Sequence, residues 1–183
     1  AAPAPPAAVY LGRAARRNVH IRVLRRGQRF GYGGAEIEVL APASGYTPGP
    51  APHNADSLVL RVRYGRHAFL LTGDTERAGE RELLDEKLAG PADVLKVAHH
   101  GSRTSTSEEF LDAARPLFAL VSLGADNLYG YPHPDVLKRL SERGIRVLRT
   151  DRHGLVRIRT DGQRLQVDTA AWTADQPGLY SVF

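Results

Sequence analysis

Short apolar runs recur between residues 93 and 149, each of a length that suits one buried strand. They read DVLKVA at 93–98, LFALVS at 117–122 and IRVLR at 145–149. The segments between them place apolar residues at helical spacing. Because strands and helices of this kind must bury their apolar faces against one another, the chain is expected to fold into layers. The alternation therefore predicts an α/β protein.

Three helices are expected from start and stop signals. The first runs over about residues 76–88, with acidic residues early and a Gly-Pro pair closing it. The second follows Ser105, which has capping-box spacing to Glu108. The third begins at Pro134, a favoured first helical residue, and ends before Gly144.

The flanking sequence predicts more strands and a long loop. A glycine- and proline-rich loop is expected at 43–56. The expected strands are 20–25, 35–42 after a turn at 25–34, two hairpin arms around Gly65-Arg66 within 57–73, and 155–160 and 164–169 around Asp161-Gly162. Together these elements predict a layered α/β protein with a mixed sheet or sheets. Residues 1–17 are expected to be an Ala/Pro-rich linker, 18–170 the domain, and 171–183 a C-terminal tail.

Charge and composition narrow the possible partners only slightly. The net charge of +5 and the pI of about 9.8 favour an anionic partner such as nucleic acid. The basic residues are nearly all arginine, however, and codon composition explains that bias equally well. The chain has no cysteine, which excludes disulfides and thiolate metal ligands. No apolar stretch reaches the length of a membrane span, and no signal peptide is recognised.

Two loops at the ends of predicted strands bear side chains suited to chemistry. Asp74 follows an apolar strand and a glycine, where it would bind a metal or cap the next helix. His99 and His100 end the next strand, and an extended backbone would point them to opposite faces. One would then ligate a metal while the other reaches the substrate. The alternative is a pair of partly exposed histidines beside a serine-rich cap.

Hydroxyl and aromatic groups lie near these residues. Ser102, Thr104 and Ser105 precede a predicted helix, where hydroxyls and amides hold phosphate well. A later loop contains Tyr131 and His133, and His133 stands at a predicted helix start, where an N-cap role is the plain alternative. The remaining histidines show no ligand spacing and are interpreted as surface or structural residues: His20, His53, His67 and His153.

Four segments in this order resemble the C-terminal metallo-β-lactamase-like domain of the ComEC family, bacterial competence proteins of the DNA-uptake channel. They are NADSLVLRVRYGRHAFLLTGD, ADVLKVAHHGSRTSTSEEFL, SLGADNLYGYPHPDVLKRL and VLRTDRHGLVRI. The resemblance implies an αββα sandwich, incomplete at its N-terminal side. It also implies a site for two divalent metals, zinc or manganese, which activate water for attack on a phosphorus centre.

The resemblance also assigns roles to individual residues. Asp74 resembles the carboxylate that bridges two metals, and His100 resembles the last histidine ligand. His99 would contact or protonate the substrate, and Ser102 would orient a phosphate. Tyr131 stands where the family often has a histidine, and tyrosine is a poor metal ligand at neutral pH. Tyrosine donates a hydrogen bond or stacks on a base instead.

One family element has no counterpart in these residues. The leading ligand motif, His-x-His-x-Asp-His, is absent and is expected upstream of residue 1. Asp74 and His100 alone are too few ligands for a tight two-metal site, because catalytic zinc usually takes three protein ligands. The missing N-terminal part of the domain is therefore an expected partner.

Three functions follow from these observations. The first is a metal-dependent nuclease that acts on DNA, single-stranded by preference, during natural transformation. The second is a DNA-binding module without catalysis, which would use Arg61, Arg63, Arg157 and Arg159 on predicted strands. The third is a hydrolase of another small phosphoester. The family setting implies an extracytoplasmic domain attached to a membrane channel.

Overall fold

The structure, a computed structural model, describes residues 6–47, 49, 53–170 and 179–182. Its main element is a seven-stranded sheet in which the strands follow one another in chain order. The first four strands pair antiparallel and the last four pair parallel. The strands are β1 (Arg29–Tyr32), β2 (Ala35–Ala41), β3 (Val59–Tyr64), β4 (His67–Leu71), β5 (Val94–Lys96), β6 (Phe118–Val121) and β7 (Arg146–Arg149).

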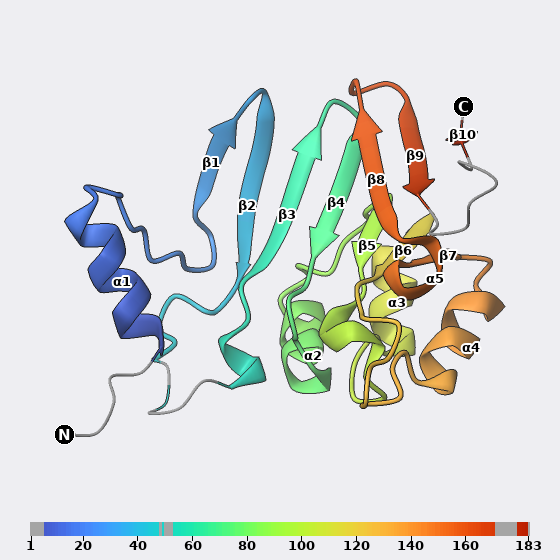
Figure 1. Cartoon of the computed structure of the whole chain (residues 1–183), viewed down its shortest axis with the longest axis horizontal. Coiled ribbons are helices and arrows are strands. Elements are labelled where there is room, and N and C mark those ends of the chain that lie inside the picture. The colour runs from blue at the N-terminus through green and yellow to red at the C-terminus, as the bar shows by residue number, and fades with distance from the viewer. Residues whose placement is uncertain (1–5, 48, 50–52, 171–178, 183) are drawn as a thin grey trace.

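Helices α2 (Arg77–Asp85), α3 (Glu108–Ala114) and α4 (Pro134–Glu142) cover one face of this sheet (Figure 1). Their apolar stripes supply Leu83, Phe110 and Leu140 to the larger core, where they meet Leu70 and Leu95 from the strands. All five side chains are at most 1% exposed. Burying side chains of this size contributes about 1.5–3 kcal/mol each, so this core anchors the strands that present the loops.

A second, three-stranded sheet packs on the opposite face. It contains β8 (Leu155–Thr160), β9 (Leu165–Ala170) and β10 (Leu179–Val182), with β9 in the centre. Short helix α5 (Thr150–His153) joins it to β7. A smaller core lies between the sheets: Val94, Phe118 and Leu148 from the large sheet and Leu165 and Val167 from the small one. The layers are therefore helix, sheet and sheet, and the predicted layered α/β architecture is confirmed.

The small sheet covers the large one unevenly. It lies over β4 to β7, whereas β1 to β3 extend to the other side of the molecule (Figure 1). Register pairing places Phe30, Ile37 and Val62 in one row on the same face as Phe69, which packs against the small sheet. These three side chains remain only half-buried. The small sheet thus covers its face of the large sheet well only over β4 to β7.

Most predicted elements are present at nearly the predicted bounds. The hairpin around Gly65-Arg66, the strand 155–160 and the helix that begins at Pro134 are confirmed. The strand predicted at 20–25 is wrong, because that segment pairs with no strand, and the turn predicted at 25–34 contains β1. Residues 1–17, predicted to be a linker, contain helix α1 (Pro6–Arg16). None of the described helices is long and apolar enough to cross a membrane.

Candidate functional site

Three parallel strands end side by side at the edge of the sheet where the candidate residues gather. β4, β5 and β6 are neighbours, so the loops that leave their carboxyl ends lie together at the lower edge of the sheet in Figure 1. Asp74 follows β4, His99 and His100 follow β5, and the loop 122–133 follows β6. These three loops, which follow one another in the sequence, are therefore also neighbours in space.

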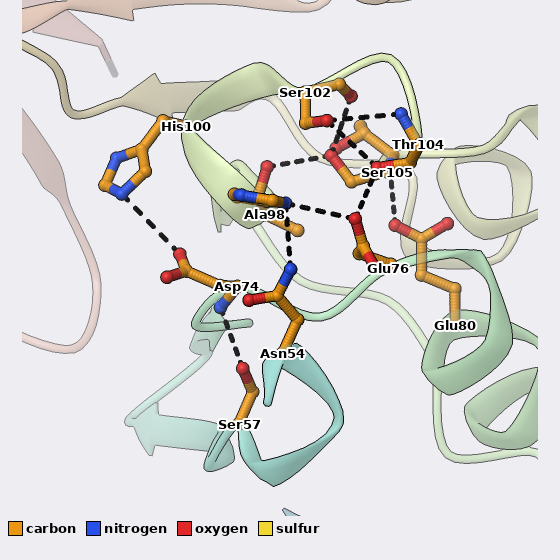
Figure 2. A network of polar contacts seen from close by, with 12 residues as sticks. Asn54, Ser57, Asp74, Glu76, Glu80, Ala98, His100, Ser102, Thr104 and Ser105 are labelled. Atoms are coloured by element: carbon orange, nitrogen blue, oxygen red, sulfur yellow. Dashed lines mark hydrogen bonds and ion pairs between the residues drawn. The ribbon is translucent and has the colours of Figure 1, made fainter. Parts of the chain in front are cut away.

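Asp74 and His100 converge on one point. The Oδ1 atom of Asp74 lies 3.6 Å from Nε2 of His100, and each side chain is 45% exposed. The backbone N–H of Asp74 donates to the hydroxyl of Ser57 at 3.0 Å, which ties the loop after β4 to the segment before β3 (Figure 2). The two residues that the sequence predicted as metal ligands are therefore brought within reach of a single cation.

The ring of His100 is oriented for ligation. Its Nδ1 atom lies 2.5 Å from the carbonyl oxygen of Ser122, so Nδ1 bears the proton and donates it. The lone pair of the neutral ring then belongs to Nε2, the atom that faces Asp74. Metal-binding histidines usually hold their second ring nitrogen in this way, which fixes the tautomer. The chemistry of the pair fits a divalent cation bound between a carboxylate oxygen and an imidazole nitrogen.

The number of donors is smaller than in a complete site. The described residues contain no group of three or more histidine, cysteine, aspartate or glutamate side chains placed to hold one metal. Catalytic zinc sites usually have three protein ligands. Asp74 and His100 therefore fit part of one coordination shell, as the sequence predicts from the missing His-x-His-x-Asp-His motif.

The backbone at the double histidine is strained rather than extended. His99 has φ 45° and ψ 45°, and His100 has φ 55° and ψ 19°, within a short 3-10 helix over Ala98–Gly101. Both conformations are left-handed, which costs a non-glycine residue free energy and occurs at turns and at functional sites. The expectation of an extended segment is wrong here. The tight turn still sends the two rings to different partners, with their centroids 6.5 Å apart.

His99 lies in a polar network that the sequence did not predict. Its Nδ1 atom is 3.3 Å from a carboxylate oxygen of Glu76 and 3.5 Å from the side-chain amide nitrogen of Asn54. The hydroxyl of Thr104 donates to the same oxygen of Glu76 at 2.6 Å. This hydrogen bond is the main reason that the pKa of Glu76 is lowered, and His99 and Asn54 contribute. Glu76 orients the His99 ring so that Nε2 is left for other contacts.

The three hydroxyls predicted to bind phosphate lie in the segment that follows the two histidines. Ser102 is 5% exposed, and its hydroxyl is 2.9 Å from that of Thr104. Ser105 is fully buried and donates to the carbonyl oxygens of Ala98 and Ser102. Ser105 therefore holds the turn together, and it does not cap α3 as its spacing to Glu108 suggested, since the N-cap residue of α3 is Ser107.

Two buried charged side chains hold the loop that follows these hydroxyls. Glu80 of α2 is fully buried and accepts the backbone N–H groups of Thr106 and Ser107. Arg139 of α4 donates from Nε to the carbonyl oxygen of Thr106 and from a terminal nitrogen to that of Ser105. Helices on either side thus fix the segment that supports the His99–His100 turn.

The loop after β6 closes the site with an aromatic wall. A pocket of about 410 Å³ is lined by Asp74, His99, His100, Leu123, Gly124, Asn127, Tyr129 and Tyr131. Tyr131 meets the His99 ring edge-on at 5.8 Å between centroids. His133 instead caps α4, because its Nδ1 accepts the backbone N–H of Asp135 at 3.2 Å. The structure brings Tyr131 into the pocket and gives His133 a structural contact.

A lysine that the sequence did not single out lies close to the site. Lys96 is the last residue of β5, and its ammonium group donates to the carbonyl oxygen of Val97 at 2.8 Å. Burial lowers the pKa of Lys96, while the negative charge of Asp74 acts in the opposite direction. Lys96 and Asp74 therefore interact electrostatically, and Lys96 adds a positive charge to the surroundings of the site.

The arginines proposed for DNA binding do not form one exposed row. Arg61 is 6% exposed, and one of its terminal nitrogens donates to the carbonyl oxygens of Leu88 and Gly90 after α2. Arg159 pairs with Asp168 of the next strand at 2.5 Å. Arg63 and Arg157 are both exposed, but they lie on strands of different sheets. Binding through this set is therefore less well supported than chemistry at the strand ends.

The strand-end site on a helix–sheet–sheet fold agrees with the comparison with known proteins. A profile of the Metallo-beta-lactamase superfamily matches residues 17–125, well over half of the chain. The chain belongs to the metallo-β-lactamase superfamily. Asp74, His99 and His100 lie inside the matched segment, whereas Tyr129 and Tyr131 lie just beyond it. Proteins of this superfamily usually bind divalent metals, which agrees with the orientation of His100.

Three relatives place this metallo-β-lactamase-type chain more narrowly. It is 42% identical to ComE operon protein 3 of Bacillus subtilis over 77% of the chain, 38% to Competence protein ComA of Neisseria gonorrhoeae over 79%, and 35% to Recombination protein 2 of Haemophilus influenzae over 79%. The resemblance to the ComEC family is thereby confirmed. The chain spans about a fifth of the length of these relatives, 18%, 21% and 18% respectively.

Proposed function

We propose that this chain is the phosphodiesterase domain of a DNA-uptake protein and that it takes part in cleaving DNA during natural transformation. The observation that supports this most directly is the Asp74–His100 pair, in which an oriented Nε2 lone pair faces a carboxylate. The relative named Competence protein ComA and the membership of the ComEC family make DNA the substrate with the best support.

Asp74 and His100 are proposed to hold a divalent cation, zinc or manganese, together with ligands from polypeptide beyond these 183 residues. A cation bound there would lower the pKa of the attacking water and stabilise the negative charge that develops on the phosphate. The relatives are about four times as long as the chain, so the remaining ligands have a source within a larger protein of this kind. Asp74 would also serve as a ligand of a second cation.

His99 is proposed to contact the scissile phosphate and to transfer a proton. With Nδ1 directed at Glu76, the Nε2 atom of His99 is free to bind the substrate in the pocket. Proton transfer by a positioned histidine contributes about 10²–10⁴-fold to a rate. Ser102 and Thr104 support this arrangement indirectly. The hydroxyl of Ser102 contacts that of Thr104, which in turn donates to Glu76. The domain is proposed to act outside the cytoplasm, attached to the membrane channel of the same protein.

The test is cation-dependent cleavage of a single-stranded oligonucleotide by this chain and by a version extended upstream. Asp74→Ala and His100→Ala should abolish cleavage by the extended protein. The matched controls Asp85→Ala and His20→Ala should keep it, because both side chains are exposed and lie outside the pocket. Equal cleavage by Asp74→Ala and by the unchanged protein would refute the proposal. Activity on small phosphodiesters with none on DNA would favour the alternative substrate class.

A further inference from the structure

The loop between β6 and α4 presents two tyrosines as a stacked pair at the mouth of the pocket. The rings of Tyr129 and Tyr131 are 5.7 Å apart between centroids and inclined by only 21°. Tyr129 is 80% exposed, whereas Tyr131 is half-buried against His99. The pair therefore has a fixed inner ring and an open outer ring.

The side chain of Asn127 braces the loop at Tyr131, the inner residue of the pair. The side-chain oxygen of Asn127 accepts the backbone N–H of Tyr131 at 2.9 Å, and its amide nitrogen donates to the carbonyl oxygen of Tyr131 at 3.0 Å. The same amide also donates to the carbonyl oxygen of Gly124 at 3.3 Å. A single side chain thus closes the loop on itself. An exposed aromatic ring on a braced loop loses little conformational freedom when a ligand binds.

We infer that Tyr129 and Tyr131 form a base-stacking platform that holds an unpaired nucleobase beside the Asp74–His100 pair. This inference rests on the proposed function and names the residues that would select single-stranded over duplex DNA. The pocket places both tyrosines next to Asp74, His99 and His100, so a base on the platform would bring its own phosphate to those residues. A paired base is already stacked within the duplex, so only an unpaired base can reach the ring. Stacking tolerates any base, because every base has a π-face.

The experiment measures binding without cleavage, by titrating a fluorescent decathymidylate into the chain in EDTA. Tyr129→Ala should weaken binding about tenfold, the effect expected from the loss of one stacked base. Tyr129→Phe keeps the ring and should bind within about twofold of the unchanged chain. Tyr32→Ala is the matched control, because Tyr32 is 82% exposed on β1, far from the pocket in the sheet order, and should bind normally.

A second ligand separates stacking from phosphate contacts. An abasic oligonucleotide of equal length has the same backbone charge, and it should bind about tenfold more weakly and be insensitive to Tyr129→Ala. Equal binding of the two oligonucleotides by the unchanged chain, or no binding of either, would overturn the inference. If Tyr129→Ala binds normally while Asp74→Ala still abolishes cleavage, the platform is refuted and the proposed function stands. If the platform behaves as expected but no cation supports cleavage, the proposed function fails alone.

Discussion

Replacing Glu80 should destabilise the loop that supports the candidate site. The carboxylate of Glu80 is fully buried and accepts two backbone N–H groups, those of Thr106 and Ser107. Glu80→Ala leaves both donors without an acceptor, and each buried unpaired donor costs about 1–3 kcal/mol. The free energy of unfolding should therefore fall by about 4 kcal/mol, a large part of the roughly 5–15 kcal/mol typical of a domain. With a urea m value of about 2 kcal/mol/M, the midpoint of unfolding should fall by about 2 M.

Two further variants make the reasoning testable. Glu80→Gln keeps one acceptor oxygen and should lose about half as much stability as Glu80→Ala. Glu86→Ala removes an exposed carboxylate at the end of the same helix and should change stability by less than about 0.5 kcal/mol. A fall of less than about 1 kcal/mol for Glu80→Ala, measured by urea unfolding at pH 7, would show that the buried hydrogen bonds do not hold this loop.

Two other predictions concern the His99–His100 turn and its contacts. The hydroxyl of Thr104 holds the pKa of Glu76 below its ordinary value of 4.5, so the folded state binds that proton less readily than the unfolded state. Glu76→Gln should lower stability at neutral pH, and urea unfolding at several pH values should show the difference vanishing as pH falls through the folded-state pKa; a difference that persists at pH 2 would contradict this. A Cβ on Gly101 would lie 2.5 Å from Cβ of Pro132 at a φ of +84°, so Gly101→Ala should lower the melting temperature by several degrees. Gly124→Ala meets no atom within 4 Å and should melt normally, and equal melting of the two variants would count against the steric argument.

The parts of the fold predicted well from sequence are those with local signals. The hairpin at Gly65-Arg66 and the strand 155–160 follow from period-two alternation and turn residues close in sequence. The strand predicted at 20–25 has the same alternation but no partner, and its apolar Ile21 and Val23 stay exposed. Alternation alone does not decide whether a neighbouring strand is available to pair.

The same distinction applies to the site. Asp74 and His100 were predictable because each lies in the loop that leaves the end of a strand, and strands that lie side by side bring their loops together. Glu76 and Asn54 were missed because their contacts with His99 join segments 23 and 45 residues apart, without a motif to mark them. Asn54 in particular lies within the glycine- and proline-rich loop predicted at 43–56, whose composition predicts no position for its side chain.

The uneven covering of the large sheet has a consequence for how the molecule fluctuates. β1 is an edge strand, and its Phe30 is only half-buried, as are Ile37 on β2 and Val62 on β3, so little apolar contact opposes its opening. Strands β4 to β6 lie between two cores, and their amide protons should exchange with solvent far more slowly. Opening of the β1–β2 hairpin can thus proceed without moving Asp74 or His100. The distance between these two side chains therefore does not depend on the least protected part of the chain.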